Sequence, residues 1–195
     1  MTQKVFWIRE SLEDDRPSGV TYHDPNGEFK STEGFKRFQA NSQVSAGTVG
    51  FPKDRWFSPV LSVSEPGTSP IGEWDYFMCS GTFGAFSERA VQVLMPFWKK
   101  SFELLPATLE GLAYSCLRCS ERTDCLDETQ SEITYFDGTT DVMEINSYVF
   151  KKELLANPMI FSIPQLTFEL FATESIPRLA FEAGLRGFDF EQVDK

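Results

Sequence analysis

Apolar and polar residues alternate over several short stretches of the chain, most clearly near the C-terminus. Residues 166–170 read Leu-Thr-Phe-Glu-Leu, and a period of two is typical of a half-buried strand. Phe188, Asp189 and Phe190 repeat this alternation close to the last residue. Shorter apolar runs predict further strands at residues 5–8, 74–78, 112–117, 133–136 and 142–145. The pattern therefore predicts a β-sheet as the framework of the fold.

Two segments carry the capping residues and the longer period of amphipathic helices. The first follows Ser87, and its apolar stripe consists of Val91, Leu94, Met95 and Trp98. Pro96 should end this helix, because proline lacks the amide donor and clashes with the preceding turn. The second follows Ser175, a candidate cap, and carries Leu179, Ala180 and Phe181 on its apolar side. Gly184 should stop it, since glycine enters the left-handed conformation at little cost.

The first third of the chain carries turn signals more often than regular periodicity. Residues 11–27 are polar and contain Pro, Gly and Asn, and residues 47–70 are rich in Pro, Gly and Ser around a small apolar island. Both compositions are typical of turns and loops. Ser31 is a candidate cap for a brief helix that carries Phe35 and Phe38.

Together these elements predict a single domain of the α+β class over residues 1–195. We expect a loop-rich part over residues 1–75 and a more regular part over residues 76–195. The sheet should be mixed or mostly antiparallel with a few short helices, because no regular strand–helix–strand alternation is present. A chain of 195 residues can bury one full core but is short for two ordinary domains.

The net charge of −11 indicates which class of macromolecule the chain can bind. An acidic surface repels nucleic acid and attracts basic proteins, so we expect a protein partner and no nucleic acid. The chain has no apolar run of eighteen residues, and charged residues are frequent among its first twenty. These features argue against a transmembrane helix and an ordinary signal peptide. We therefore expect a cytoplasmic protein that does not bind membranes.

Acidic residues concentrate between residues 121 and 144, where eight acidic residues and one arginine give a net charge of −7. Such a run is either a solvated face that keeps the protein soluble or a landing surface that speeds association with a cationic partner. The densest part holds Asp124, Asp127, Glu128 and Glu132. These four residues are our candidate contacts for such a partner.

Cysteine and histidine are the residues with which an enzyme or metal site would have to be built. Cys116, Cys119 and Cys125 form a C-x2-C-x5-C pattern, and His23 is the only histidine. Structural zinc needs four ligands, and residues three apart on a strand point to opposite faces. We therefore expect no metal, no cofactor and no catalytic residue. The alternative is a small enzyme of unassigned chemistry that is centred on His23 or on the three cysteines.

The C-terminal sequence resembles a known family. The segments that carry the resemblance are LFATES and AGLRGFDFEQV, between Leu170 and Val193, and SYVFKKELLANPMIFSI before them. The chain from about Phe77 onward is similar to bacterial immunity proteins found beside polymorphic toxins (immunity family eleven, once a domain of unknown function). The resemblance implies a non-enzymatic protein that binds and neutralises a cognate toxin by non-covalent occlusion. It further implies that the toxin is encoded next to the chain and acts in interbacterial competition, as a contact-dependent or type VI-type effector.

Overall fold

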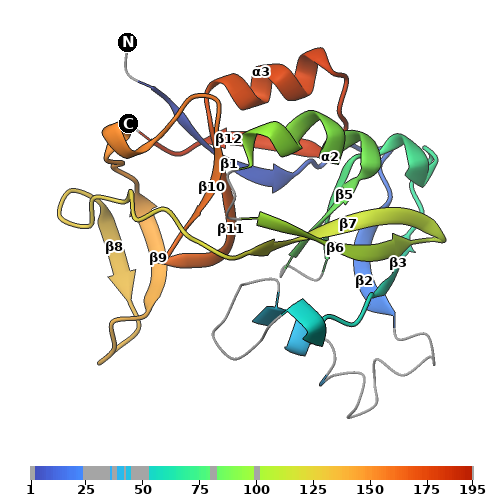
Figure 1. The fold of residues 1–195 in the computed structure, drawn as a ribbon, viewed down its shortest axis with the longest axis horizontal. Coiled ribbons are helices and arrows are strands. Elements are labelled where there is room, and N and C mark those ends of the chain that lie inside the picture. Colours follow the sequence, from blue (N-terminus) through green and yellow to red (C-terminus); the bar gives the residue numbers. More distant parts are fainter. Residues whose placement is uncertain are drawn as a thin grey trace.

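Two β-sheets that pack on a shared set of buried side chains form the framework of the molecule (Figure 1). The computed structural model describes residues 3–23, 36, 39–41, 43–44, 53–79, 83–98 and 102–194. The first sheet has four antiparallel strands in the spatial order β10 (Ile160–Ile163), β11 (Leu166–Thr173), β1 (Val5–Glu10) and β12 (Phe188–Gln192). The N-terminal strand β1 therefore lies inside this sheet, between two strands from the end of the chain.

The second sheet has six strands. Their spatial order is β2 (Ser18–His23), β3 (Val60–Glu65), β6 (Phe102–Leu109), β7 (Leu112–Cys119), β5 (Phe83–Ser87) and β4 (Tyr76–Cys79). Among these described strands only β3 and β6 pair in parallel, and every other pair is antiparallel. The α+β class with mixed and mostly antiparallel sheets is therefore confirmed.

A two-stranded hairpin and short helices accompany the two sheets. The hairpin consists of β8 (Glu132–Tyr135) and β9 (Val142–Ser147), and it stands apart from the other two sheets at the left of Figure 1. Helices α2 (Glu88–Leu94) and α3 (Ser175–Glu182) contact each other. No described helix has the length and apolar character needed to span a bilayer. Single 3-10 turns are η1 (Lys53–Arg55), η2 (Ile71–Glu73), η3 (Met95–Phe97) and η4 (Lys152–Leu154).

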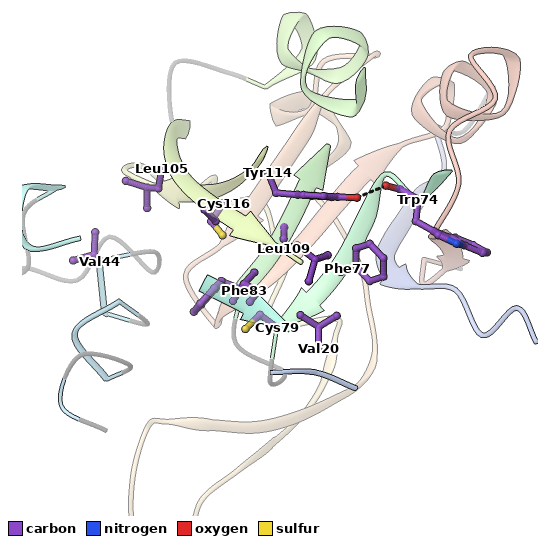
Figure 2. Packing of buried hydrophobic residues seen from close by; sticks show 13 residues of the cluster. Val20, Val44, Trp74, Phe77, Cys79, Phe83, Leu105, Leu109, Tyr114 and Cys116 are labelled. Carbon is purple, nitrogen blue, oxygen red and sulfur yellow. Dashed lines mark hydrogen bonds between the residues drawn. The ribbon is translucent and has the colours of Figure 1, made fainter. Parts of the chain in front are cut away.

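The alternation of side chains on the strands divides the core into layers. On β4, Tyr76 and Met78 point to the cluster shared by both sheets and the helices, whereas Phe77 and Cys79 point to the opposite face of the six-stranded sheet. Figure 2 shows that opposite face, where the Tyr114 hydroxyl also donates to the Trp74 carbonyl over 2.7 Å. A period of two therefore buries both sides of this sheet.

A third cluster lies on the other side of the four-stranded sheet and is rich in aromatic rings. Phe150, Phe161 and Phe171 pack with centroid separations of 5.7–6.0 Å, within the range of favourable aromatic pairs. Ile145 of the hairpin is 7% exposed and belongs to the same cluster. The hairpin is therefore anchored at its base, although a two-stranded hairpin alone is marginally stable.

The helix signals at Ser87 are confirmed. The Ser87 hydroxyl accepts a hydrogen bond from the Ala90 amide over 3.0 Å and caps α2, as expected for a serine at this position. The α-helix ends at Leu94, and Pro96 lies in the 3-10 turn that follows. Met95 is 53% exposed, so its assignment to the buried stripe was wrong, because the helix stops before it.

The second helix corrects two expectations. Ser175 is the first residue of α3 and not its cap: Glu174 holds that position without a side-chain bond. The Asn157 side chain, which is distant in sequence, accepts from the Ser175 amide over 3.3 Å. Phe181 is 84% exposed and faces away from the core. The stop at Gly184, with φ of 65°, is confirmed.

Two further strands lie where the sequence predicts turns and loops. Residues 18–23 form β2 and residues 60–65 form β3, and these strands pair with each other in antiparallel register. Pairing partners and burial of Val20 and Leu61 outweigh the local turn signals of Gly and Ser, since strand preference depends strongly on context. Ser31, Phe35 and Phe38, on which a brief helix was expected, lie outside the described residues, whereas residues 36, 39–41 and 43–44 are helical.

Candidate functional site

The acidic segment leaves the six-stranded sheet after β7 and leads into the β8–β9 hairpin. Asp124, Glu128 and Glu132 are exposed. Within the described part of the chain none of the three carboxylates forms an ion pair with a lysine or arginine. Residues 123–150 contain no basic residue. The negative charge of this surface is therefore left for solvent or for a partner.

Asp127 differs from the other three candidate contacts, because its carboxylate holds a turn. One oxygen accepts from the Thr129 amide over 3.0 Å and from the Thr129 hydroxyl over 2.6 Å. The other accepts from the Gln130 side chain over 2.6 Å. These hydrogen bonds stabilise the ionised form and lower the pKa of Asp127. This aspartate therefore shapes the segment in addition to carrying charge.

The segment is fastened to residues 149–151 just before the turn. Leu126 is 1% exposed and forms an isolated antiparallel bridge with Phe150. The Asp127 amide donates to the Val149 carbonyl over 2.8 Å, and the Lys151 amide donates to the Cys125 carbonyl over the same distance. The exposed carboxylates are therefore carried on a well-ordered backbone.

A groove of about 600 Å³ separates the hairpin from the turn between β10 and β11. Glu128 and Asp141 contribute carboxylates to its lining, and no lining residue is basic. The Gln165 side-chain amide donates to Glu128 over 2.5 Å. The remaining lining residues are Tyr135, Thr139, Thr140, Val142, Pro164 and Thr167. This combination of acceptor groups suits a cationic side chain.

Three large apolar side chains are exposed on the same hairpin. Tyr135 is 41% exposed, Phe136 53% and Met143 59%. They flank the turn that contains Asp137 and Gly138. The sequence pattern predicts a strand over residues 133–136 but does not indicate that these three apolar side chains are exposed. The Asp-Gly pair beside apolar residues is the signal of a hairpin tip that could have indicated it.

The three cysteines do not converge on one site. Cys116 is buried in the cluster beneath the six-stranded sheet, whereas Cys125 is buried in the aromatic cluster beside the other sheet. Burial raises the pKa of the Cys116 and Cys119 thiols, which keeps them protonated and weakly nucleophilic. No described group of three or more His, Cys, Asp or Glu side chains is placed to hold a metal ion. His23 ends β2, but its side chain lies outside the described part of the structure.

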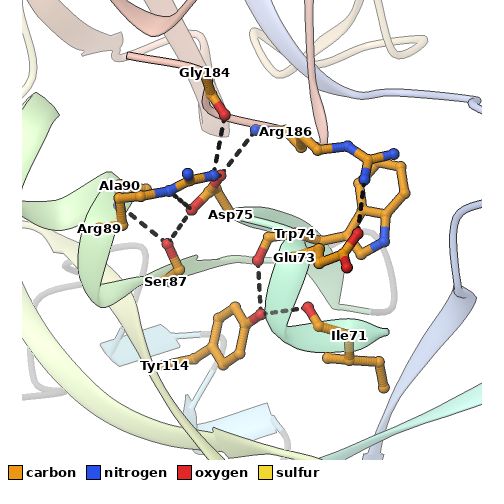
Figure 3. A network of polar contacts seen from close by, with 10 residues as sticks. All are labelled: Ile71, Glu73, Trp74, Asp75, Ser87, Arg89, Ala90, Tyr114, Gly184 and Arg186. Carbon is orange, nitrogen blue, oxygen red and sulfur yellow. Dashed lines mark hydrogen bonds and ion pairs between the residues drawn. The ribbon is translucent and has the colours of Figure 1, made fainter. Parts of the chain in front are cut away.

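A second polar cluster lies around the buried carboxylate of Asp75, which is 2% exposed (Figure 3). It accepts from the Ser87 hydroxyl over 2.5 Å, from the Arg89 guanidinium over 2.5 and 3.1 Å, and from the Arg186 amide over 2.8 Å. Arg89 also donates to the Gly184 carbonyl over 3.0 Å. These contacts join the residue before β4, the end of β5, the start of α2 and the segment after α3.

The same cluster continues on the side chain of Arg186. Its guanidinium lies 3.9 Å from the ring centroid of Trp74 and donates to Glu73 over 3.1 Å and to Asp15 over 3.0 Å. The aspartate and the arginine are thus satisfied within the chain, as buried or partly buried charges usually are. This cluster joins parts of the chain that are distant in sequence.

Comparison with known proteins supports the resemblance noted in the sequence. Residues 110–195 match the Immunity protein family (Imm11). No curated protein matches the chain. The matched span contains the acidic segment, the hairpin, the groove and the C-terminal strands. It does not contain β1, on which β11 and β12 pair.

Proposed function

We propose, from the match of residues 110–195 to an immunity protein family, that this chain binds a cognate bacterial toxin and neutralises it by non-covalent occlusion. The family implies a role in toxin immunity that needs no catalysis. The toxin would be encoded next to this chain and would act in interbacterial competition, as a contact-dependent or type VI-type effector. The protein would meet it in the cytoplasm.

The observation that carries this proposal is the position of the acidic segment inside the matched span. Its carboxylates are exposed and lack basic neighbours between residues 123 and 150. Complementary charge raises association rates about 10- to 1,000-fold, and a fast inhibitor protects a cell best. We propose Asp124, Glu128 and Glu132 as direct contacts, with Asp127 contributing charge and holding the turn. Nucleic acid would be repelled by the same surface.

Co-expression with the toxin domain encoded beside this chain tests the proposal. Cells that make the toxin domain alone should stop growing, and cells that also make this chain should survive. The two proteins should co-purify on a tag placed on the toxin domain. Survival without a complex, or turnover of the toxin by purified protein, would contradict neutralisation by binding.

A further inference from the structure

The end of the β8–β9 hairpin combines exposed apolar side chains with an acidic groove. Ile133, Val142 and Ile145 supply the contacts that attach the hairpin to the aromatic cluster. Tyr135 and Met143 alternate with these anchoring residues along the two strands, Phe136 follows Tyr135, and all three side chains remain 41–59% exposed. Exposed apolar side chains that gather on one small element often mark an interaction site.

The charges beside these side chains define the chemistry of the occupant. Asp137, Asp141 and Glu144 are exposed on or next to the turn, and Glu128 and Asp141 line the groove behind it. The lining also supplies threonine hydroxyls. An arginine or lysine side chain carries only donors. The groove therefore complements a cation that is supplied by the partner.

We infer that the β8–β9 hairpin is the main docking element for a basic protein, with its exposed apolar side chains packed against the partner and its groove holding one arginine or lysine side chain. This inference rests on the proposed function, and the basic protein is the toxin. The arrangement of an apolar centre within a charged rim is the common anatomy of protein interfaces. Tyr135, Phe136 and Met143 set the lifetime of the complex, whereas the surrounding carboxylates set its rate of formation.

The test uses the purified toxin domain that is encoded beside this chain and a kinetic binding measurement. The hairpin variant carries Tyr135→Ser, Phe136→Ser and Met143→Ser. The matched control carries Leu12→Ser, Met95→Ser and Phe181→Ser, three residues that are 95%, 53% and 84% exposed elsewhere on the molecule. Both variants remove the same number of exposed apolar side chains, so both should keep the wild-type melting temperature.

The hairpin variant should dissociate at least about 30-fold faster, the size expected when one interface hot spot is lost. The control should dissociate at the wild-type rate. A further variant with Glu128→Gln and Asp141→Asn keeps the shape of the groove and should weaken binding about tenfold or more, mostly at low salt.

The two levels of inference fail in different ways. If wild-type protein binds and the folded hairpin variant dissociates within threefold of it, the hairpin is not the docking element and the proposed function stands. The same conclusion follows if the control loses as much affinity as the hairpin variant. If wild-type protein does not bind the toxin domain, the proposed function fails, and the docking inference fails with it.

Discussion

Carboxylates serve opposite purposes in two regions of this molecule. Around Asp75, every acceptor is matched by a donor from the chain itself: Ser87, Arg89 and the Arg186 amide converge on one buried side chain. Between residues 123 and 150, the chain supplies seven acidic residues and no basic one. The carboxylate is therefore a hydrogen-bonded structural group at Asp75 and a charge without a basic partner in the acidic segment.

The buried carboxylate contributes to the stability of the fold, whereas the exposed carboxylates are available to a partner. A buried charge must be paired within the protein, because its desolvation is otherwise too costly. An exposed carboxylate loses little by lacking a partner, since water solvates it and surface ion pairs contribute only about 0–1 kcal/mol. Changes at Asp75 should therefore act on stability, and changes at the hairpin segment should act on binding.

Asp75→Ala should produce the largest loss of stability. It leaves the Ser87 hydroxyl and the Arg186 amide without their acceptor and removes the partner of Arg89. We expect a loss of about 3 kcal/mol in the free energy of unfolding, near the lower end for a broken buried pair because Arg89 is half-exposed and can be solvated. Urea denaturation measures the loss, with Asp75→Asn as the isosteric control. A loss below about 0.5 kcal/mol would show that the network is not structural.

Phe188→Ala should come next, and Phe190→Ala should cost less. Phe188 stacks on Tyr76 at 4.9 Å, whereas the described ring contact of Phe190 is with Phe188 at 5.8 Å. Both rings are only partly buried, so we expect about 2–3 kcal/mol for Phe188 and about 1 kcal/mol for Phe190, below the range for a fully buried phenylalanine. Thermal unfolding followed by circular dichroism checks the order. Unchanged melting in both variants would remove the closing strand from the core.

Reversal of three hairpin-segment charges should leave stability almost unchanged. A variant with Asp124→Lys, Glu128→Lys and Glu132→Lys should unfold within about 0.5 kcal/mol of wild type, as is usual for surface changes. Its association with the proposed toxin should slow by about tenfold or more and lose its salt dependence. Stopped-flow mixing at two ionic strengths measures both. A folded variant that associates at the wild-type rate would exclude these residues from the interface.

Asp127→Asn should have the smallest effect, and that effect should depend on pH. Hydrogen bonds from Thr129 and Gln130 lower the pKa of Asp127 in the folded protein. Its contribution is therefore present above the unfolded pKa and is lost as the pH falls through the folded pKa. The difference between wild type and Asp127→Asn should shrink as the pH is lowered from about 7 to about 3. A difference that grows on acidification would contradict the assigned cause.

Local signals were enough to place the elements that depend on neighbours in sequence. The Ser87 cap, the proline after α2 and the alternation in β11 all act within a few residues, and each was predicted. The acceptor for the first amide of α3 could not be predicted, because it is the side chain of Asn157 on a distant segment. Strands β2 and β3 were not predicted for a similar reason: their pairing and burial outweigh a local composition that favours turns.

The candidate site shows the same limit more strongly. The concentration of charge between residues 121 and 144 was visible in the sequence, and the structure leaves most of it exposed. The special role of Asp127 depends on the geometry of one turn. The groove is formed by residues 128–142 together with residues 164–167, and separation in the chain hides such a juxtaposition from any linear pattern.

The position of β1 determines when the four-stranded sheet can assemble during synthesis. Val5 pairs with Thr173, and Trp7 pairs with both Phe171 and Glu191, so β1 must wait for the strands that flank it. At about 5–20 residues per second the wait lasts roughly 10–40 s. An interrupted chain lacks a neighbour for β1 and exposes an unpaired, apolar strand that invites aggregation. The four-stranded sheet can thus assemble only after β12 has been synthesised.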